Sequence, residues 1–305
     1  MKIIESRSEL QGWSDRQRAE GHRIALVPTM GALHAGHLSL VKTARERTDR
    51  VIVSIFVNPT QFNDPSDFEG YPRVMDDDLA ACREAGVDVV WAPAAEELYP
   101  QGAASSATWV DVEGLTDPLC GSNRPGHFRG VTTIVTKLFL AARPHVAVFG
   151  EKDFQQLAVI RRMTVDLGFG IEIAGGQTVR EHDGLALSSR NVRLGRNARR
   201  QALVISRSLA LAESMVAQGE RSHAAILEVV RKQLDEATQA SIDYADLRDP
   251  ESLLPAPESL DGPVLLAIAL QFEPDNTDNT DNTDESANVG AAVRLIDNRI
   301  LNPKE

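Results

Sequence analysis

The 305-residue chain has few cysteines, no long apolar run and no excess of positive charge. Its two cysteines, Cys82 and Cys120, are too few for a disulfide framework and lack the spacing of a zinc site. The longest apolar runs, such as 264–270, have the length of a strand, so we expect no membrane span. The net charge of −12 argues against a nucleic-acid-binding surface, because phosphate backbones attract clustered lysine and arginine.

The beginning of the chain also lacks the features of a targeting segment. The apolar run within residues 1–6 is too short for a signal peptide, and charge follows it at once. We therefore expect a cytoplasmic protein. A hydrophobic content of 42% and a charged content of 25% are ordinary for a globular chain, and the length suffices for two domains.

Up to about residue 180, short apolar runs alternate with amphipathic segments. The predicted strands are 24–27, 51–57, 87–91 and 146–149, and the predicted helices are 38–48, 76–85, 131–142 and 153–167. This alternation predicts an α/β fold, a Rossmann-like doubly wound parallel sheet with helices on both faces. Ligands bind such sheets at the carboxyl ends of the strands, just beyond which Pro28, Asn58 and Gly150 fall. We expect the polar motifs there to converge on one crevice.

Beyond residue 180 the pattern changes. Two long amphipathic segments, 196–218 and 222–239, precede predicted strands at 242–247, 264–272 and 291–296, which together indicate a smaller α+β domain. We place the boundary near 180–183, which divides the chain into domains of residues 1–181 and 182–305.

One segment of the second domain has low complexity. The triplet Asp-Asn-Thr repeats from Asp275 to Thr283, and such a polar run cannot bury apolar area. We therefore predict a disordered, exposed insertion at 275–288. A calcium site is the less favoured alternative, because the glycine turn and the terminal bidentate glutamate of a calcium loop are missing.

The most informative motif is Pro-Thr-Met-Gly-Ala-Leu-His-Ala-Gly-His at 28–37, between an apolar run and an amphipathic segment. This order predicts a strand, a glycine loop and a helix. The free N–H groups at a helix start favour anions, and the rings of His34 and His37 add two donors there. The motif predicts a site for a phosphate chain. The alternative is that the histidines merely cap the helix.

A second polar motif, Gly-Glu-Lys-Asp-Phe-Gln-Gln at 150–156, follows another predicted strand and opens a helix. Gly150 allows a ligand to approach closely, and Lys152 suits a transferring phosphoryl oxygen. Asp153 is suited to cap the helix or to bind a ribose hydroxyl. The alternative is an ordinary charged helix start.

Two amides follow the predicted strand at 51–57. Asn58 and Gln61 are neutral donors and acceptors that suit a small hydroxy acid, although Asn-Pro is also common turn chemistry. The carboxylates of 76–78 suit a magnesium ion or the acidic first turn of a helix.

Two other segments have a polar or basic composition. Ser188, Ser189 and Arg190 suit a mobile clamp for terminal phosphates, or a helix cap with a surface arginine. Residues 124–130 form a basic, glycine-rich loop before a predicted helix, and this loop could close over a substrate.

Taken together, these segments resemble the pantoate–β-alanine ligase family. His-Ala-Gly-His at 34–37 is the signature of the wider nucleotidyltransferase superfamily. The segments specific to the ligases are 28–37, 56–62, 124–131, 150–156 and 187–191, in the family's order, and 294–298 resembles its C-terminal strand. The resemblance implies an AMP-forming carbon–nitrogen ligase. In such a ligase, pantoate attacks the α-phosphorus of ATP to form pantoyl adenylate, and the amine of β-alanine then displaces AMP.

The resemblance also implies residue roles. The expected ATP-binding residues are Met30, Gly31, His34, His37, Gly150, Lys152, Asp153, Val179, Leu187, Ser188, Ser189 and Arg190. The expected substrate-binding residues are Asn58, Gln61, Gln156, Arg124 and His127. His34, His37 and Lys152 are the expected catalytic residues. The family usually labels His37 a proton donor, but a carboxylate nucleophile needs no base, so we favour stabilisation of phosphate charge. Asp77 is the expected ligand of Mg²⁺ bound with ATP.

For partners, the resemblance implies ATP, pantoate and β-alanine, a homodimer, and neither nucleic acid nor membrane. Two other functions stay open. A nucleotidyltransferase that makes a dinucleotide or a CDP-alcohol would need cationic residues for a phosphate acceptor, and the neutral set Asn58, Gln61 and Gln156 disfavours it. A nucleotide-binding regulator without turnover could dispense with Lys152 and the serine–arginine clamp, both of which are present.

Overall fold

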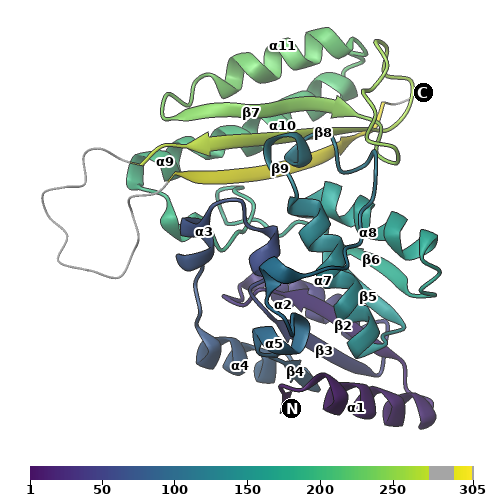
Figure 1. Cartoon of the computed structure of the whole chain (residues 1–305). Helices are drawn as coiled ribbons and strands as arrows, with labels where there is room; N and C mark the ends of the chain where they lie inside the picture. Colours follow the sequence, from purple (N-terminus) through teal and green to yellow (C-terminus); the bar gives the residue numbers. More distant parts are fainter. Residues whose placement is uncertain (275–291, 304–305) are drawn as a thin grey trace, which may run out of the picture. The chain divides into compact units, whose positions relative to one another are not determined.

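A computed structural model describes residues 1–274 and 292–303, so the predicted insertion at 275–288 lies outside the described residues. The chain divides into two units, residues 1–179 and 180–305 (Figure 1). Each unit has its own hydrophobic core.

The first unit contains the parallel sheet. Its elements in chain order are β1 (Lys2–Ile4), α1 (Arg7–Ala19), β2 (Ile24–Thr29), α2 (Ala35–Arg45), β3 (Arg50–Ile55), η1 (Pro59–Gln61), α3 (Pro65–Glu69), α4 (Met75–Glu84), β4 (Val89–Trp91), α5 (Ala95–Leu98), η2 (Ala103–Ser105), α6 (Cys120–Asn123), α7 (His127–Ala142), β5 (Val146–Gly150), η3 (Glu151–Asp153), α8 (Phe154–Asp166) and β6 (Glu172–Gly176).

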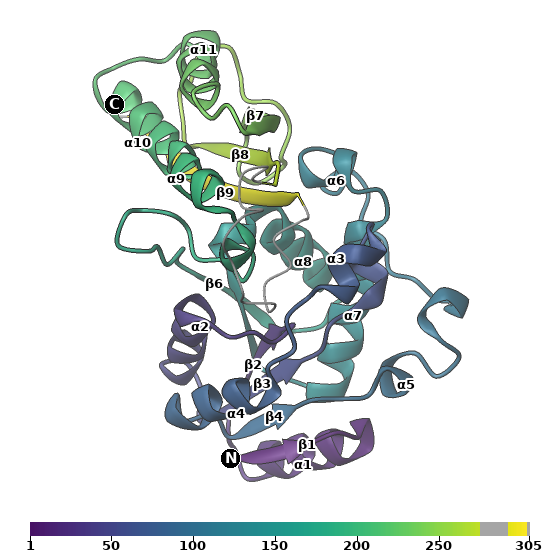
Figure 2. The ribbon, with the colours of Figure 1, turned by 90° about the vertical axis from the view of Figure 1, so that its left-hand side faces the viewer.

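The six strands are ordered β1-β4-β3-β2-β5-β6, and all neighbours are parallel. This arrangement confirms the predicted doubly wound sheet. Alternate residues of β2 face opposite sides, so Ala25 and Val27 pack with Leu40 of α2 and Leu79 of α4. The helices α1 and α7 contact each other and β2, and α7 lies on the other side of the sheet from α2 and α4 (Figure 2).

Besides several short helices, the elements of this unit that were not predicted include β1, α1 and β6. The strand β1 has only three residues, and β6 ends in two glycines, so neither has a clear apolar run. In α1 the buried apolar residues are Leu10 and Trp13 alone, which is too few for a helical period.

Some predicted boundaries were also wrong. The strand β2 continues through Pro28 to Thr29, because Pro28 faces β5 and the pairing of β2 with β5 has already ended at Leu26. The missing N–H of the proline therefore costs no ladder hydrogen bond. The helix α7 begins at His127, so 127–130 are helical and not a loop, after Gly126 turns the chain at φ 77°.

The second unit has η4 (Asn191–Arg193), α9 (Arg196–Gln201), α10 (Leu203–Ala217), α11 (His223–Leu234), β7 (Ala240–Arg248), β8 (Val264–Phe272) and β9 (Val293–Leu301). The antiparallel order is β7-β8-β9, and apolar residues of this sheet pack against α10 and α11. The predicted helix 196–218 is interrupted at Ala202. The strand β9 extends beyond the predicted 291–296, because its pairing with β8 continues to Leu301. Within it, the buried Asp297 forms a bidentate ion pair with Arg180 at 2.6 and 3.1 Å.

Candidate nucleotide and substrate site

The strands that carry the polar motifs are neighbours. The strand β2 lies between β3 and β5, so the glycine loop after β2, the amides after β3 and the lysine after β5 meet at the carboxyl edge of the sheet. Chain order also reverses here, because β3 and β4 continue on one side of β2 and β5 and β6 on the other. Such a switch point is where open α/β sheets bind ligands.

The glycine loop is a strained turn that a buried carboxylate holds. Gly31 and Ala32 have φ values of 83° and 50°, in the left-handed region. Asp78 on α4, which is only 2% exposed, accepts the N–H of Ala32 at 2.9 Å and of Leu33 at 2.7 Å. A Cβ at position 31 would lie 2.9 Å from the Asp78 carboxylate, so the close approach needs glycine. Sequence reasoning missed this role of Asp78.

The neighbouring carboxylate has a different environment. Asp77 is exposed, although it lies next to Asp78 in the first turn of α4. Burial raises the pKa of Asp78, while its hydrogen bonds from Leu33 and Ala32 lower it. Both oxygens of Asp78 are occupied by the loop, so Asp77 is the one of the two whose carboxylate faces solvent.

The two histidines both cap α2 and offer donors. The Nδ1 of His34 accepts the N–H of Gly36 at 3.1 Å, and the Nδ1 of His37 accepts the N–H of His34 at 3.3 Å. An Nδ1 that accepts a hydrogen bond cannot carry the proton, so Nε2 is the protonated nitrogen of each ring. The two rings therefore cap the helix, and this capping leaves each ring with an Nε2–H donor.

Both rings are neutral at neutral pH. Burial, above all, lowers the pKa of His34 and lowers that of His37 to about 3. The neighbouring His34 and the positive charge of Lys152 contribute to the shift at His37, while Asp153 opposes it. The ring centroids of the histidines are 4.1 Å apart. Lys152 therefore lies close enough to influence the charge of both histidines.

The segment after β5 provides charge and space. The Nζ of Lys152 lies 3.8 Å from the carboxylate of Asp153, and the lysine side chain is only 19% exposed. Gly150 ends β5, and a Cβ built there would meet no atom within 4 Å. Open space at this glycine leaves room for a ligand beside Lys152.

Gln61 is held at both ends. Its backbone carbonyl accepts hydrogen bonds from Arg124 at 3.1 Å and from the ring of His127 at 2.8 Å. Its side-chain nitrogen lies 3.1 Å from the sulfur of Met30, in the glycine loop. Its side-chain oxygen accepts from Asn58 at 3.0 Å. Arg124 and His127, predicted as substrate residues, thus contact Gln61.

The structure also distinguishes two adjacent glutamines at the start of α8. Gln155 is buried and bonds the backbone of Leu115, Pro118 and Cys120 at 2.6–3.0 Å, so it fixes the preceding loop. Gln156 is only half-buried. Gln156 is the residue that was predicted to bind substrate, and its side chain takes no part in these hydrogen bonds to the loop.

The remaining predicted ATP residues lie further along the chain. Val179 is the last residue of the first unit, and 187–190 belong to the second. There the Oγ of Ser188 accepts the N–H of Arg190 at 3.2 Å, which forms a tight turn before η4.

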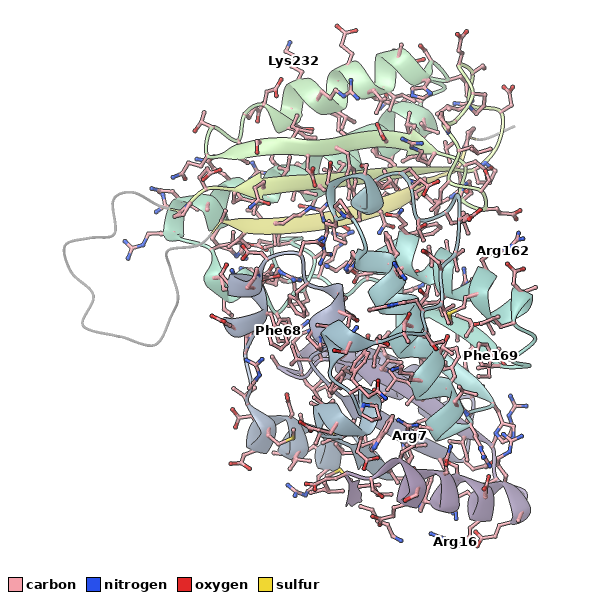
Figure 3. All side chains as sticks on the ribbon, viewed as in Figure 1. Arg7, Arg16, Phe68, Arg162, Phe169 and Lys232 are labelled. Atoms are coloured by element: carbon pink, nitrogen blue, oxygen red, sulfur yellow. The ribbon has the colours of Figure 1, made fainter. Side chains whose placement is uncertain are left out.

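A separate cavity of about 640 Å³ opens between α1 and the end of α7, and its lining includes none of the predicted site residues. Figure 3 labels two residues that line it, Arg7 on α1 and Phe169 before β6. His145 and Ile171 in its wall precede β5 and β6, so this cavity lies at the amino edge of the sheet. It is distinct from the candidate site at the carboxyl edge.

Two negative findings concern only residues 1–274 and 292–303. Within them, no group of three or more histidine, cysteine, aspartate or glutamate side chains is arranged to hold a metal ion. Among the helices of this same part, none combines the length and the apolar character needed to cross a bilayer.

A doubly wound sheet with a helix-capping histidine pair, a lysine and neutral amides at its switch point is the arrangement of a nucleotide-binding α/β protein. More particularly, the chain belongs to the pantoate-beta-alanine ligase family, whose model matches residues 2–300. Members of this family are ligases, and the function of the family is the ATP-dependent condensation of pantoate with β-alanine.

Known proteins resemble the chain over its whole length. Pantothenate synthetase from Geobacter sulfurreducens is 48% identical over 305 residues, which is all of both chains. The crystal structure of pantothenate synthetase from Thermus thermophilus is 42% identical, with a TM-score of 0.87 over 99% of this chain and all of that one. A pantoate-beta-alanine ligase from Francisella tularensis, solved in complex with "Beta-gamma ATP" and β-alanine, is 30% identical, with a TM-score of 0.76 over 98% of this chain and 97% of that one.

Proposed function

We propose that this chain joins pantoate to β-alanine through pantoyl adenylate and releases pyrophosphate and AMP. One observation carries the proposal. At the switch point of the sheet, two neutral imidazoles present Nε2–H donors, and the charge of Lys152 acts on the ring of His37. Gln61 follows β3, the strand beside β2. This combination suits a triphosphate beside a small hydroxy acid, which are the substrates of the family's first step.

In the first step, a carboxylate oxygen of pantoate forms a bond to the α-phosphorus of ATP, and the bond from that phosphorus to pyrophosphate breaks. Negative charge develops on the α-phosphoryl oxygens and on the leaving group. We assign His34, His37 and Lys152 to stabilise this charge, the rings through their N–H groups and the lysine through its full charge. The low pKa of His37 supports hydrogen-bond donation over proton transfer.

In the second step, the amine of β-alanine attacks the acyl carbon of pantoyl adenylate. The bond from this carbon to the adenylate oxygen breaks, AMP leaves, and the amine loses a proton. The same donors then stabilise the phosphate of the departing AMP. Gln61 and Gln156 are assigned to orient pantoate, and the contacts of Arg124 and His127 with Gln61 support an indirect role for that pair.

The binding set for ATP includes backbone as well as side-chain groups. The open space at Gly150 and the positive φ of Gly31 support close approach of the nucleotide to the chain. The proposed ATP-binding residues are Met30, Gly31, His34, His37, Gly150, Lys152, Asp153, Val179, Leu187, Ser188, Ser189 and Arg190.

We assign Asp77 to hold Mg²⁺ together with ATP. Magnesium is commonly bound by one or two carboxylates and substrate phosphates, and the exposure of Asp77 fits that mode. Asp78 fits it less well, because its two oxygens already accept backbone N–H groups. When bound, the ion would neutralise phosphate charge.

The family also leads us to propose a cytoplasmic homodimer. Light scattering after size-exclusion chromatography would measure its mass directly. A mass near twice 33.2 kDa is the expected result. A mass near 33.2 kDa over the whole concentration range would reject the dimer.

The proposed reaction is tested by AMP release from ATP and magnesium, with pantoate and β-alanine supplied together and omitted singly. AMP together with pantothenate, only when both acids are present, is the expected result. AMP that forms without either acid, or phosphate-transfer products without AMP, would instead indicate a nucleotidyltransferase. Nucleotide binding with no product at all would indicate a regulator.

A further inference from the structure

Asn58 lies at the centre of a buried hydrogen-bond network beside Gln61. It is 1% exposed, and its side-chain oxygen accepts from the hydroxyls of Tyr99 at 2.8 Å and Thr60 at 3.1 Å. Its side-chain nitrogen donates to the oxygen of Gln61 at 3.0 Å and to the backbone carbonyl of Gly130 at 3.2 Å. Each polar atom of this amide is therefore used within the protein.

The network determines which end of each amide faces which neighbour. The carbonyl of Gly130 can only accept, so the nitrogen of Asn58 must face it, and the oxygen of Asn58 must face the two hydroxyls. The same nitrogen faces Gln61, so Gln61 must present its oxygen to Asn58. The nitrogen of Gln61 then points away, toward Met30 in the glycine loop.

The reverse orientations are unfavourable. Turning the Gln61 amide over would place its nitrogen against the nitrogen of Asn58, which sets two donors face to face. Turning Asn58 over would place its oxygen against the carbonyl of Gly130 and the oxygen of Gln61, and the two hydroxyls would have to accept from its nitrogen instead of donating to its oxygen. Each change leaves buried groups without their hydrogen bonds, which is costly in a protein interior.

We propose that Tyr99 is a positioning residue that, through Asn58, keeps the N–H side of the Gln61 amide toward the substrate. The site therefore selects a ligand group that accepts hydrogen bonds, such as a carboxylate or hydroxyl oxygen, and disfavours one that presents only donors. This inference rests on the proposed function, in which Gln61 contacts pantoate. Tyr99 does not contact the substrate itself.

Tyr99 is well placed to act as a fixed donor. It is 3% exposed, and the Nζ of Lys137 lies 4.0 Å from the centroid of its ring. Burial raises the pKa of the Tyr99 phenol, so the hydroxyl keeps its proton at neutral pH. Arg124 and His127 hold the backbone of Gln61, so Tyr99 and Asn58 need to orient only its side chain.

The test compares Tyr99→Phe, Thr60→Val and their combination, using KM for pantoate, KM for ATP and the Kd of pantoate by calorimetry. We expect Tyr99→Phe to raise KM and Kd for pantoate about fivefold to tenfold and the combination to raise them about 25- to 100-fold, since loss of each hydroxyl removes one hydrogen bond to Asn58. KM for ATP should stay within about twofold. Tyr244→Phe, on β7 of the second unit, is the matched control and should change neither constant.

Rescue by a conservative variant separates orientation from packing. Thr60→Ser keeps the hydroxyl, so Tyr99→Phe with Thr60→Ser should bind pantoate like Tyr99→Phe alone, whereas Thr60→Val should weaken it further. Asn58→Asp should weaken pantoate binding at least about 100-fold, because a carboxylate cannot donate to Gly130 and would make Gln61 turn over. Equal losses for Ser and Val, or parallel changes in KM for ATP, would overturn the inference.

The outcomes also separate this inference from the proposed function. A wild-type chain that binds pantoate but makes no pantothenate would reject the proposed function, and the affinities of the variants would still decide the role of Tyr99. Wild-type affinity in the Tyr99→Phe, Thr60→Val combination would reject the role of Tyr99 while leaving the reaction intact. A wild-type chain that binds no pantoate would reject both.

Discussion

Replacement of His37 tests whether this ring acts as a neutral donor or as an acid. Its pKa is lowered to about 3, so at pH 7 about one free chain in 10⁴ carries the imidazolium form. In the chain without ATP, forming the imidazolium at pH 7 would cost about 5 kcal/mol, at about 1.4 kcal/mol for each pH unit. A neutral ring incurs no such cost, and its Nε2–H is already the donor.

The two roles predict different kinetic effects for substitutions of His37. Loss of one hydrogen bond to a charged group costs about 1.5–3 kcal/mol, so His37→Ala should lower kcat/KM for ATP by about 10- to 150-fold. His37→Gln keeps an N–H donor near the same position and should lose less than about tenfold. Between pH 5 and 9, the pH profile of kcat/KM should have the same shape in the wild type and in His37→Gln.

The assay is continuous release of pyrophosphate at saturating pantoate and β-alanine, with unfolding temperatures measured to show that each variant is folded. His22→Gln is the matched control, because His22 precedes β2 at the opposite edge of the sheet from the candidate site, and it should leave kcat/KM unchanged. A limb with an apparent pKa of 6–7 in the wild type that is absent from His37→Gln would refute the reasoning. Equal losses for the Gln and Ala variants would refute it too.

Three further predictions concern other residues. Asp78→Asn leaves one buried backbone N–H of the glycine loop without an acceptor, so it should lower the unfolding free energy by about 1–3 kcal/mol in chemical denaturation and raise KM for ATP. The exposed Asp77→Asn should instead raise the magnesium concentration that the reaction requires, at unchanged stability. Equal effects of the two variants would contradict both assignments. In Gly130→Ala the new methyl would meet the backbone carbonyl of Thr60 and should displace η1. This displacement should raise KM for pantoate and lower the unfolding free energy by about 1–3 kcal/mol. Wild-type kinetics would instead show that α7 moves and leaves Gln61 in place. Asp297→Asn breaks a buried bidentate ion pair and should lower the unfolding free energy by about 3–5 kcal/mol in urea, a loss whose absence would mean that the pair is dispensable.

Much of the fold follows from patterns that are local in the chain. The buried strands β2, β3 and β5 are short runs of apolar residues, and α2, α4 and α8 have a helical apolar period, so their order predicts the doubly wound sheet. The elements that were missed have weak local patterns. The strand β6 contains two glycines, and a Cβ at Gly176 would overlap the side chain of Leu40, so this strand depends on its pairing with β5 and its packing against α2.

The candidate site divides in the same way. The donors of His34 and His37 follow from a short motif at a helix start, because capping depends on residues only a few positions apart. The separation of Asp77 from Asp78 does not follow from the sequence, because both are aspartates in the same first turn. Which of them reaches the glycine loop depends on how α4 is rotated against the sheet.

By itself, the sequence determined the order of the strands and helices that carry the site motifs, the glycine loop with its histidine pair, and the kinds of group that follow those strands. Only the tertiary structure decided that Tyr99 and Gly130, which are 41 and 72 positions from Asn58, set the orientation of two amides. It also decided that Arg124 and His127 hold the backbone of Gln61. The physical reason is that a hydrogen bond between distant residues depends on how whole elements pack, and no local pattern contains that information.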